Sequence, residues 1–162
     1  MTGWDVLTGL APVAPHTGPF PHAGFLGAWW RHHGTGTLLP IRSGRGAMVL
    51  VVAEGTAEFA GAAGLTDYHS PVGSDLDGVV AEIRGALSAG TRLALDSLPL
   101  EASEPLMKQF ASAGVALTMR PHDATMILGL PGDAAAYLAT LDGKQRHEVR
   151  RKRRRFAEQA GA

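Results

Sequence analysis

Apolar side chains recur at the three-to-four-residue spacing of a helix in several segments of the chain. The first helix is predicted to open at Pro21 and end at Gly34, with an apolar face formed by Phe25, Leu26, Trp29 and Trp30. At least one of the two indoles is expected to be buried against a sheet. Further helices are predicted from a Ser74 N-cap to Gly90, from Ser103 and Pro105 to Gly114, and from Asp133 without interruption to about Gln159.

Short apolar runs bounded by glycine indicate strands between these helices. Thr37–Arg42 and Ala47–Ala53 flank Ser43-Gly-Arg-Gly46 and are expected to form a hairpin. Because strands and helices alternate, we predict an α/β (α+β) fold: a mixed sheet flanked by helices, ending in a long basic helix. Residues 1–20 are expected to form an irregular lead-in, 21–132 one lobe and 133–162 the basic helix. The remaining predicted strands are 57–60, 92–98, 115–119 and 125–130.

Charge is distributed unevenly along the chain. Residues 1–143 carry 7 basic and 13 acidic side chains, whereas residues 144–162 carry 8 basic and 2 acidic ones. The formal net charge of zero therefore combines an acidic body with a basic terminal helix, which points to an anionic partner. The same arginines can be interpreted as the solvated side of a helix that docks by a thin apolar stripe. Their density favours contacts with anionic groups by Arg146, Arg150, Arg151 and Arg154.

Several function classes have no support in the sequence. There is no cysteine, which excludes a disulfide framework and a thiolate nucleophile and suits a cytoplasmic protein. The Gly-x-Ser-x-Gly nucleophile motif is absent, the histidines show no metal-ligand spacing, and no apolar run is long enough for a membrane span. Gly44 and Gly46 lie between two predicted strands rather than before a helix, so they do not form a phosphate loop. The catalytic residues stay unknown, and no metal is expected.

One glycine-rich loop, between the strand at 57–60 and the next helix, carries polar side chains of interest. Asp67 and Tyr68 place a carboxylate beside a phenol there, in the kind of segment where binding residues are often found. The alternative is a structural one, in which Asp67 closes a turn and Tyr68 fills a gap in the packing.

Three groups of residues together resemble the first half of two-lobed GNAT-type acetyltransferases. The closest branch is the one associated with cellulose and exopolysaccharide biosynthesis, which is related to the Fem-type aminoacyltransferases. The resemblance covers nearly the whole chain after Pro19. It is carried by Phe20…Trp29-Trp30-Arg-His-His-Gly34, by Phe59-x-Gly…Asp67-Tyr68-x-x-Pro71-Val72, and by Leu141-x-x-Lys144-x-Arg146-x-x-x-Arg150-Arg151-x-x-Arg154.

The resemblance implies an N-terminal lobe of an acyl-CoA-dependent N-acyltransferase that acts on an amino group of a sugar or cell-envelope precursor. Acetyl-CoA is then expected to bind mainly to a C-terminal catalytic lobe beyond Ala162, and this segment alone is expected to be inactive. Asp67 and Tyr68 become acceptor-binding residues, and the four arginines become anion or interlobe contacts. The alternatives are a module that binds nucleic acid, which the acidic body disfavours, or one that binds an acidic protein through the basic helix.

Overall fold

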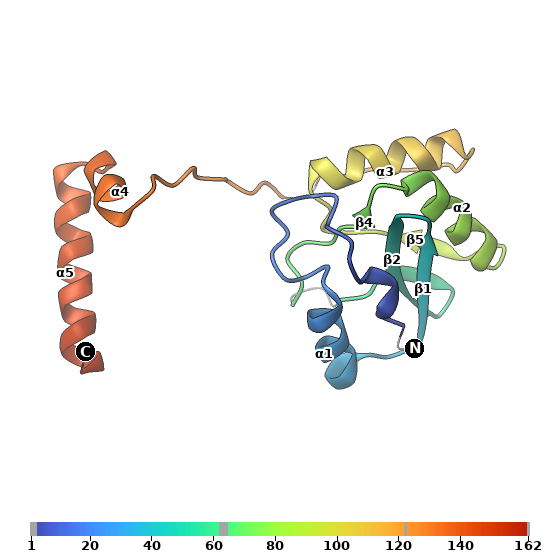
Figure 1. Cartoon of the computed structure of the whole chain (residues 1–162), viewed down its shortest axis with the longest axis horizontal. Coiled ribbons are helices and arrows are strands. Elements are labelled where there is room, and N and C mark those ends of the chain that lie inside the picture. The colour runs from blue at the N-terminus through green and yellow to red at the C-terminus, as the bar shows by residue number, and fades with distance from the viewer. Residues whose placement is uncertain (1–2, 62–64, 122, 162) are drawn as a thin grey trace. The chain divides into compact units, whose positions relative to one another are not determined.

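The computed structural model describes residues 3–61, 65–121 and 123–161 of the chain (Figure 1). They form two compact units, Met1–Met119 and Arg120–Ala162. The first unit contains a sheet, three α-helices and a short 3-10 helix, and the second contains the last two α-helices. This mixed α/β architecture, which ends in a long helix, confirms the predicted fold class.

The sheet of the first unit has five strands and mixes both pairing directions. Along its main path the order is β1-β2-β3-β5; β1, β2 and β3 are antiparallel neighbours, whereas β5 is parallel to β3. The short strand β4 pairs with β2 off this path. The strand bounds are Thr37–Ser43 (β1), Gly46–Ala53 (β2), Thr56–Phe59 (β3), Val72–Gly73 (β4) and Arg92–Ala94 (β5).

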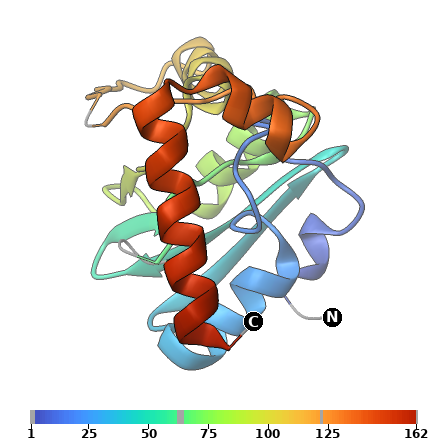
Figure 2. The same ribbon diagram turned by 90° about the vertical axis from the view of Figure 1, so that its left-hand side faces the viewer.

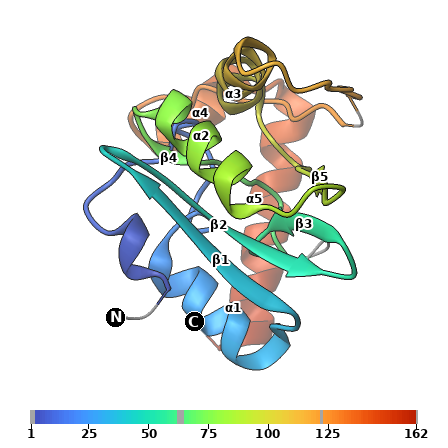
Figure 3. The same cartoon turned by 90° about the vertical axis from the view of Figure 1, so that its right-hand side faces the viewer.

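Helices cover both faces of the sheet because alternate residues of β2 point to opposite sides. Met48 and Leu50 belong to a core with α2 (Leu76–Ala86) and α3 (Leu100–Ser112), in which Ile83 and Leu106 are buried. Ala47 and Val49 face the other way, toward α1 (Ala23–His33) and the 3-10 helix η1 (Asp5–Leu7). Figure 3 shows α2 and α3 on one side of the sheet and α1 on the other.

The predicted apolar face of α1 packs as a helix face, but neither indole is fully buried. Leu26 is the buried residue of this helix, and Trp29 is a half-buried side chain that packs against the same core. Trp30 lies against Trp29 and Trp4 at ring-centroid distances of 5.9 Å and 6.5 Å. The expectation of a buried indole was therefore wrong, because a leucine takes the innermost position and the aromatic rings cover it.

Two helices begin at other residues than predicted. Asp75, rather than Ser74, caps α2, and its carboxylate accepts a hydrogen bond from the Gly78 amide at 3.3 Å. Helix α3 begins at Leu100, so Pro105 lies inside it instead of opening it. Proline in a helix interior removes one intrahelical hydrogen bond, which the burial of Leu106 and its neighbours in the core outweighs here.

The strand predictions fail toward the end of the first unit. Strand β5 stops at Ala94 instead of Leu98, and the described residues of 115–119 and 125–130 form no strand. Met126 and Leu130 are exposed instead, with 97% and 71% of their surfaces accessible. Apolar β-branched composition predicts a strand only where a neighbouring strand is available to pair with it.

The second unit contains two helices where one continuous helix was predicted. Helix α4 is Ala134–Thr140 and helix α5 is Gly143–Ala160. Asp142 is extended and caps α5 through a capping box, in which its side chain accepts from the Gln145 amide while the Gln145 side chain accepts from the Asp142 amide. This local hydrogen-bonding competes with the helix at Asp142 and breaks it there. Figure 2 shows α5 as one straight helix after the bend.

Candidate functional site

Polar residues gather in the first unit where two parallel strands end. Phe59 is the last residue of β3, and Asp96 follows its parallel neighbour β5. The loop after β3 brings His69 between them, although His69 and Asp96 are 27 residues apart in the chain. The carboxyl ends of neighbouring parallel strands are a frequent position for ligand sites in α/β proteins.

His69 is held on two sides. Its ring stacks on Phe59 with centroids 5.0 Å apart and an interplanar angle of 8°. Its Nδ1 lies 3.1 Å from the Asp96 carboxylate and 3.2 Å from the Asp96 carbonyl oxygen. Because both neighbours are acceptors, Nδ1 carries the proton and Nε2 is left with a free lone pair.

Burial controls the protonation of this histidine. His69 is 4% exposed, and desolvation lowers its pKa below the ordinary value, while the nearby Asp96 and Glu58 carboxylates oppose that shift. The neutral imidazole is therefore the form that the fold favours. The main chain adds to the restraint, since the His69 amide donates to the Ser97 carbonyl at 2.9 Å and Ser97 has a positive φ of 52°.

Two buried polar atoms of this cluster have no hydrogen-bond partner within the described part of the chain. They are Nε2 of His69 and Oγ1 of Thr66, a residue that is only 3% exposed. Both lie beside Gly61, since a Cβ placed on that glycine would be 2.8 Å from each of them. Buried polar groups are nearly always hydrogen-bonded, so a pair of unpaired ones marks this position as unusual.

A groove of about 470 Å³ opens on the α1 side of β2 and β3. Glu54 and Glu58 contribute carboxylates to its lining, and Trp29 contributes an indole whose buried N–H has no partner among the described residues. Phe59 and Gly61 also line it, so the groove reaches the residues that flank the His69 cluster. Its remaining lining residues are His33, Thr35, Val51, Ala53 and Thr56.

Asp67 and Tyr68, the acceptor-binding residues of the sequence prediction, lie in the loop that carries His69. Asp67 is exposed and Tyr68 is half-buried, so neither side chain is deep in the core. Neither residue lines the groove, and their acceptor-binding role stays a prediction. Ala62, Ala63 and Gly64 of the same loop lie outside the described residues.

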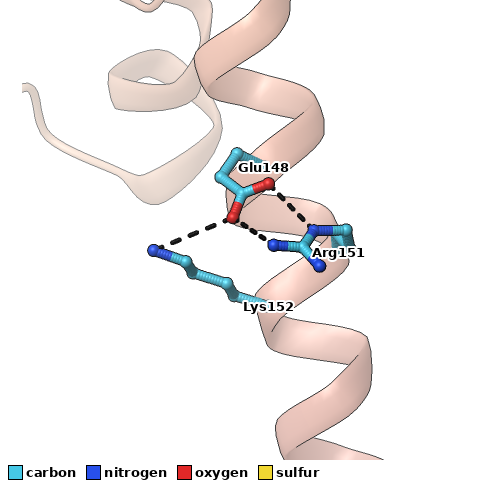
Figure 4. A network of polar contacts seen from close by, with 3 residues as sticks. All are labelled: Glu148, Arg151 and Lys152. Atoms are coloured by element: carbon cyan, nitrogen blue, oxygen red, sulfur yellow. Dashed lines mark hydrogen bonds and ion pairs between the residues drawn. The ribbon is translucent and has the colours of Figure 1, made fainter.

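The four predicted arginines of α5 have different surroundings. Arg151 donates to both Glu148 oxygens, at 2.9 Å and 2.5 Å, and these bonds lower the pKa of Glu148 (Figure 4). Arg154 pairs loosely with Glu158 at 3.8 Å, and Arg146 donates to the Leu141 carbonyl. Arg150 is exposed and has no partner within the described residues, which leaves it free for an anion.

Sequence reasoning missed His69, Thr66 and Asp96. The signal for Asp96 was a polar residue just after a strand, but the predicted strand 92–98 ran through it. Nothing in the chain near His69 distinguishes it from the other histidines. Its role depends on the parallel pairing of β3 with β5, which no local pattern reveals.

Within the described residues, no group of three or more His, Asp or Glu side chains is placed to hold a metal ion. No helix among them has the length and apolar character that crossing a membrane requires.

No protein-family model matches this chain, and comparisons with curated proteins and with solved structures found no similar protein. The resemblance to two-lobed acetyltransferases therefore stays a hypothesis, and function is inferred from the geometry of the groove and of the basic helix.

Proposed function

We propose that this chain is the acceptor-binding lobe of an acyl-CoA-dependent N-acyltransferase and that its groove binds the amino group of a sugar or cell-envelope precursor. The observation that carries the proposal is the composition of the groove, where two glutamates and the aromatic side chain of Trp29 line one hollow of about 470 Å³. The sequence motifs that resemble the acetyltransferases support the same conclusion.

The groove suits an amino sugar chemically. Glu54 and Glu58 attract an ammonium group, and because both are exposed each contributes about 1 kcal/mol or less. The half-buried indole of Trp29 offers an apolar edge to a sugar ring. These contacts fix the position of the amine without reacting with it.

In the proposed reaction the bound ammonium group first releases a proton to water, and the neutral amine nitrogen then attacks the carbonyl carbon of the thioester. A C–N bond forms, the C–S bond breaks, and the proton lost by the amine balances the CoA thiolate that leaves. Backbone N–H groups stabilise the intermediate oxyanion in such a reaction. We assign the acyl-CoA site to a second lobe, as the resemblance implies, and acceptor binding to this one.

Titration of the chain with glucosamine tests the proposal, with glucose and N-acetylglucosamine at equal ionic strength as controls. We expect glucosamine alone to shift the amide resonances of Glu58 and Gly61, and the double variant Glu54→Gln, Glu58→Gln to weaken its binding at least fivefold. Glu82→Gln, which removes an exposed carboxylate from α2, is the matched control and should bind normally. Equal responses to all three sugars, or none, would contradict the proposal.

A second candidate function, binding of a polyanion, is favoured by one face of α5. Arg146, Arg150 and Arg153 share that face because they are three to four residues apart, and the two carboxylates of the helix, Glu148 and Glu158, lie on other faces. Duplex DNA should then bind with an affinity that falls steeply between 50 and 200 mM salt, on the order of tenfold per few phosphate contacts. Arg150→Glu with Arg153→Glu should abolish this binding, and Arg84→Glu on α2 should not. Absence of salt-dependent binding by the wild type excludes this function.

A further inference from the structure

The unpaired atoms of Thr66 and His69 form a second polar feature next to the groove. Both side chains are more than nine-tenths buried, and neither Oγ1 of Thr66 nor Nε2 of His69 has a partner within the described residues. A buried polar atom without a hydrogen-bond partner is destabilising, so two such atoms at one position need an explanation.

The two atoms face a common point. Each is 2.8 Å from the position that a Cβ on Gly61 would occupy, so they lie within twice that distance of one another. Gly61 has a φ of 130°, in the region that favours glycine, and any side chain there would collide with both atoms. Because Gly61 also lines the groove, it is the residue at which the groove and the two polar atoms meet.

The orientation of the imidazole is set in advance. Stacking on Phe59 and the contacts of Nδ1 with Asp96 leave Nε2 as an acceptor aimed at the Gly61 side. Thr66 Oγ1 can both donate and accept. A ligand group that donates N–H or O–H to Nε2 and exchanges a hydrogen bond with Oγ1 satisfies both atoms at once.

We propose that Thr66 and His69 form a subsite that receives the amino group, or the hydroxyl beside it, of an amino sugar bound in the groove. The inference rests on the proposed acceptor function, since it takes its ligand class from the groove. Both atoms are closed to solvent in the free chain, so binding displaces the Gly61 backbone and must change the Gly61 amide resonance. The side chains act by holding the ligand, and no proton transfer is required of them.

The threonine provides the first arm of the test. Thr66→Val keeps the shape of the side chain and removes a hydroxyl that is unpaired in the free chain, so the thermal midpoint should stay the same or rise while glucosamine binds about five- to tenfold more weakly. Thr17→Val is the matched control, because Thr17 is equally buried but its hydroxyl donates to the Ala14 carbonyl at 3.1 Å. That variant should lose thermal stability and keep its affinity for glucosamine.

The histidine provides the second arm. In the ¹⁵N spectrum of histidine-labelled chain, Nε2 of His69 should appear unprotonated and shift on addition of glucosamine, while the resonances of exposed His22 stay in place. An ordered water in the adjoining cavity of about 10 Å³, which His69 and Ser70 line, is the competing explanation. In that case Nε2 is hydrogen-bonded before the sugar is added and does not respond to it.

The outcomes separate this subsite from the groove. Full glucosamine affinity in Thr66→Val, together with an unchanged Nε2 resonance, overturns the subsite even where the Glu54 and Glu58 variant confirms the groove. Loss of glucosamine binding in Thr66→Val and in the Glu54 and Glu58 variant supports both the subsite and the groove. Absence of glucosamine binding by the wild type overturns the acceptor proposal and this inference with it.

Discussion

At the scale of single residues, the buried imidazole of His69 links the candidate site to stability. Desolvation lowers its pKa from the unfolded value of 6.5, so the unfolded chain binds the proton more readily than the folded one. The stabilising contribution is complete above pH 6.5. This contribution is lost as the pH falls from 6.5 to the lower pKa that His69 has in the folded chain.

We therefore expect the thermal midpoint of the wild type to fall as the pH is lowered below 6.5, toward pH 5. His69→Phe keeps the ring stacked on Phe59 and should remove this part of the pH dependence. His32→Asn, at an exposed position of α1, should leave it unchanged. Thermal melts between pH 5 and 8 measure the effect, and identical profiles for wild type and His69→Phe would argue against it.

Gly61 gives a second prediction at the same scale. Gly61→Ala combines a φ of 130° with a Cβ that would lie 2.8 Å from both Thr66 and His69, so it should cost well over 1 kcal/mol of unfolding free energy. Gly55→Ala is the control, because its φ of 75° is strained for alanine while no atom lies within 4 Å of the new Cβ. Urea unfolding should show that Gly61→Ala is the more destabilising of the two variants. The reverse order would show that Thr66 and His69 move away from the added Cβ at little cost.

At the scale of elements, local capping decided the shape of the basic region. Periodicity favoured one helix from Asp133 to Gln159. The Asp142 side chain instead caps the N-terminus of α5, and the backbone hydrogen bonds of a continuous helix are interrupted between α4 and α5. The Asp142-Gly-Lys-Gln145 capping box was readable from the sequence, and continuous apolar spacing was given too much weight against it.

We expect the double variant Asp142→Ala, Gly143→Ala to join α4 and α5 into one helix. The change removes a cap worth about 0.5–2 kcal/mol, and replacing glycine by alanine returns about 1 kcal/mol of helix propensity. Cα chemical shifts at Leu141 and residue 142 should move from extended to helical values. Asp133→Ala should fray only the first turn of α4 and leave the break intact; extended shifts that persist in the double variant would contradict the capping explanation.

At the scale of the whole molecule, three of the helices begin with an aspartate that caps them. The carboxylates of Asp75, Asp133 and Asp142 each accept a hydrogen bond from one amide in the first turn of α2, α4 and α5, at a position where an anionic ligand would otherwise bind. Gly44 lies in the turn between the antiparallel strands β1 and β2, and Gly46 is the first residue of β2, so the predicted hairpin is confirmed. Helices α1 and α3 have no side-chain cap, so the assignment of the donor site to a second lobe rests on the resemblance.

The 162-residue chain alone is therefore expected to bind CoA weakly or not at all and to transfer no acetyl group from acetyl-CoA to glucosamine. Calorimetric titration with acetyl-CoA and a thiol-release assay measure both properties. The variant Asp75→Ser keeps a capping oxygen at the start of α2 and removes the negative charge of the carboxylate. Its affinity for acetyl-CoA is compared with that of the wild type. Micromolar affinity of the wild type for acetyl-CoA would place a donor site within this chain and overturn the assignment.

The sequence by itself determined the elements whose signals are local. The hairpin of β1 and β2, the apolar face of α1 and the stripe of α2 were predicted because turn residues and side-chain periodicity act within a few positions of the chain. Only the tertiary structure decided that β5 pairs with β3 and thereby brings Asp96 to His69. That contact depends on parallel strands joined by a long connection, and the burial that leaves Thr66 and His69 unpaired arises only once those strands and the loop between them have packed together.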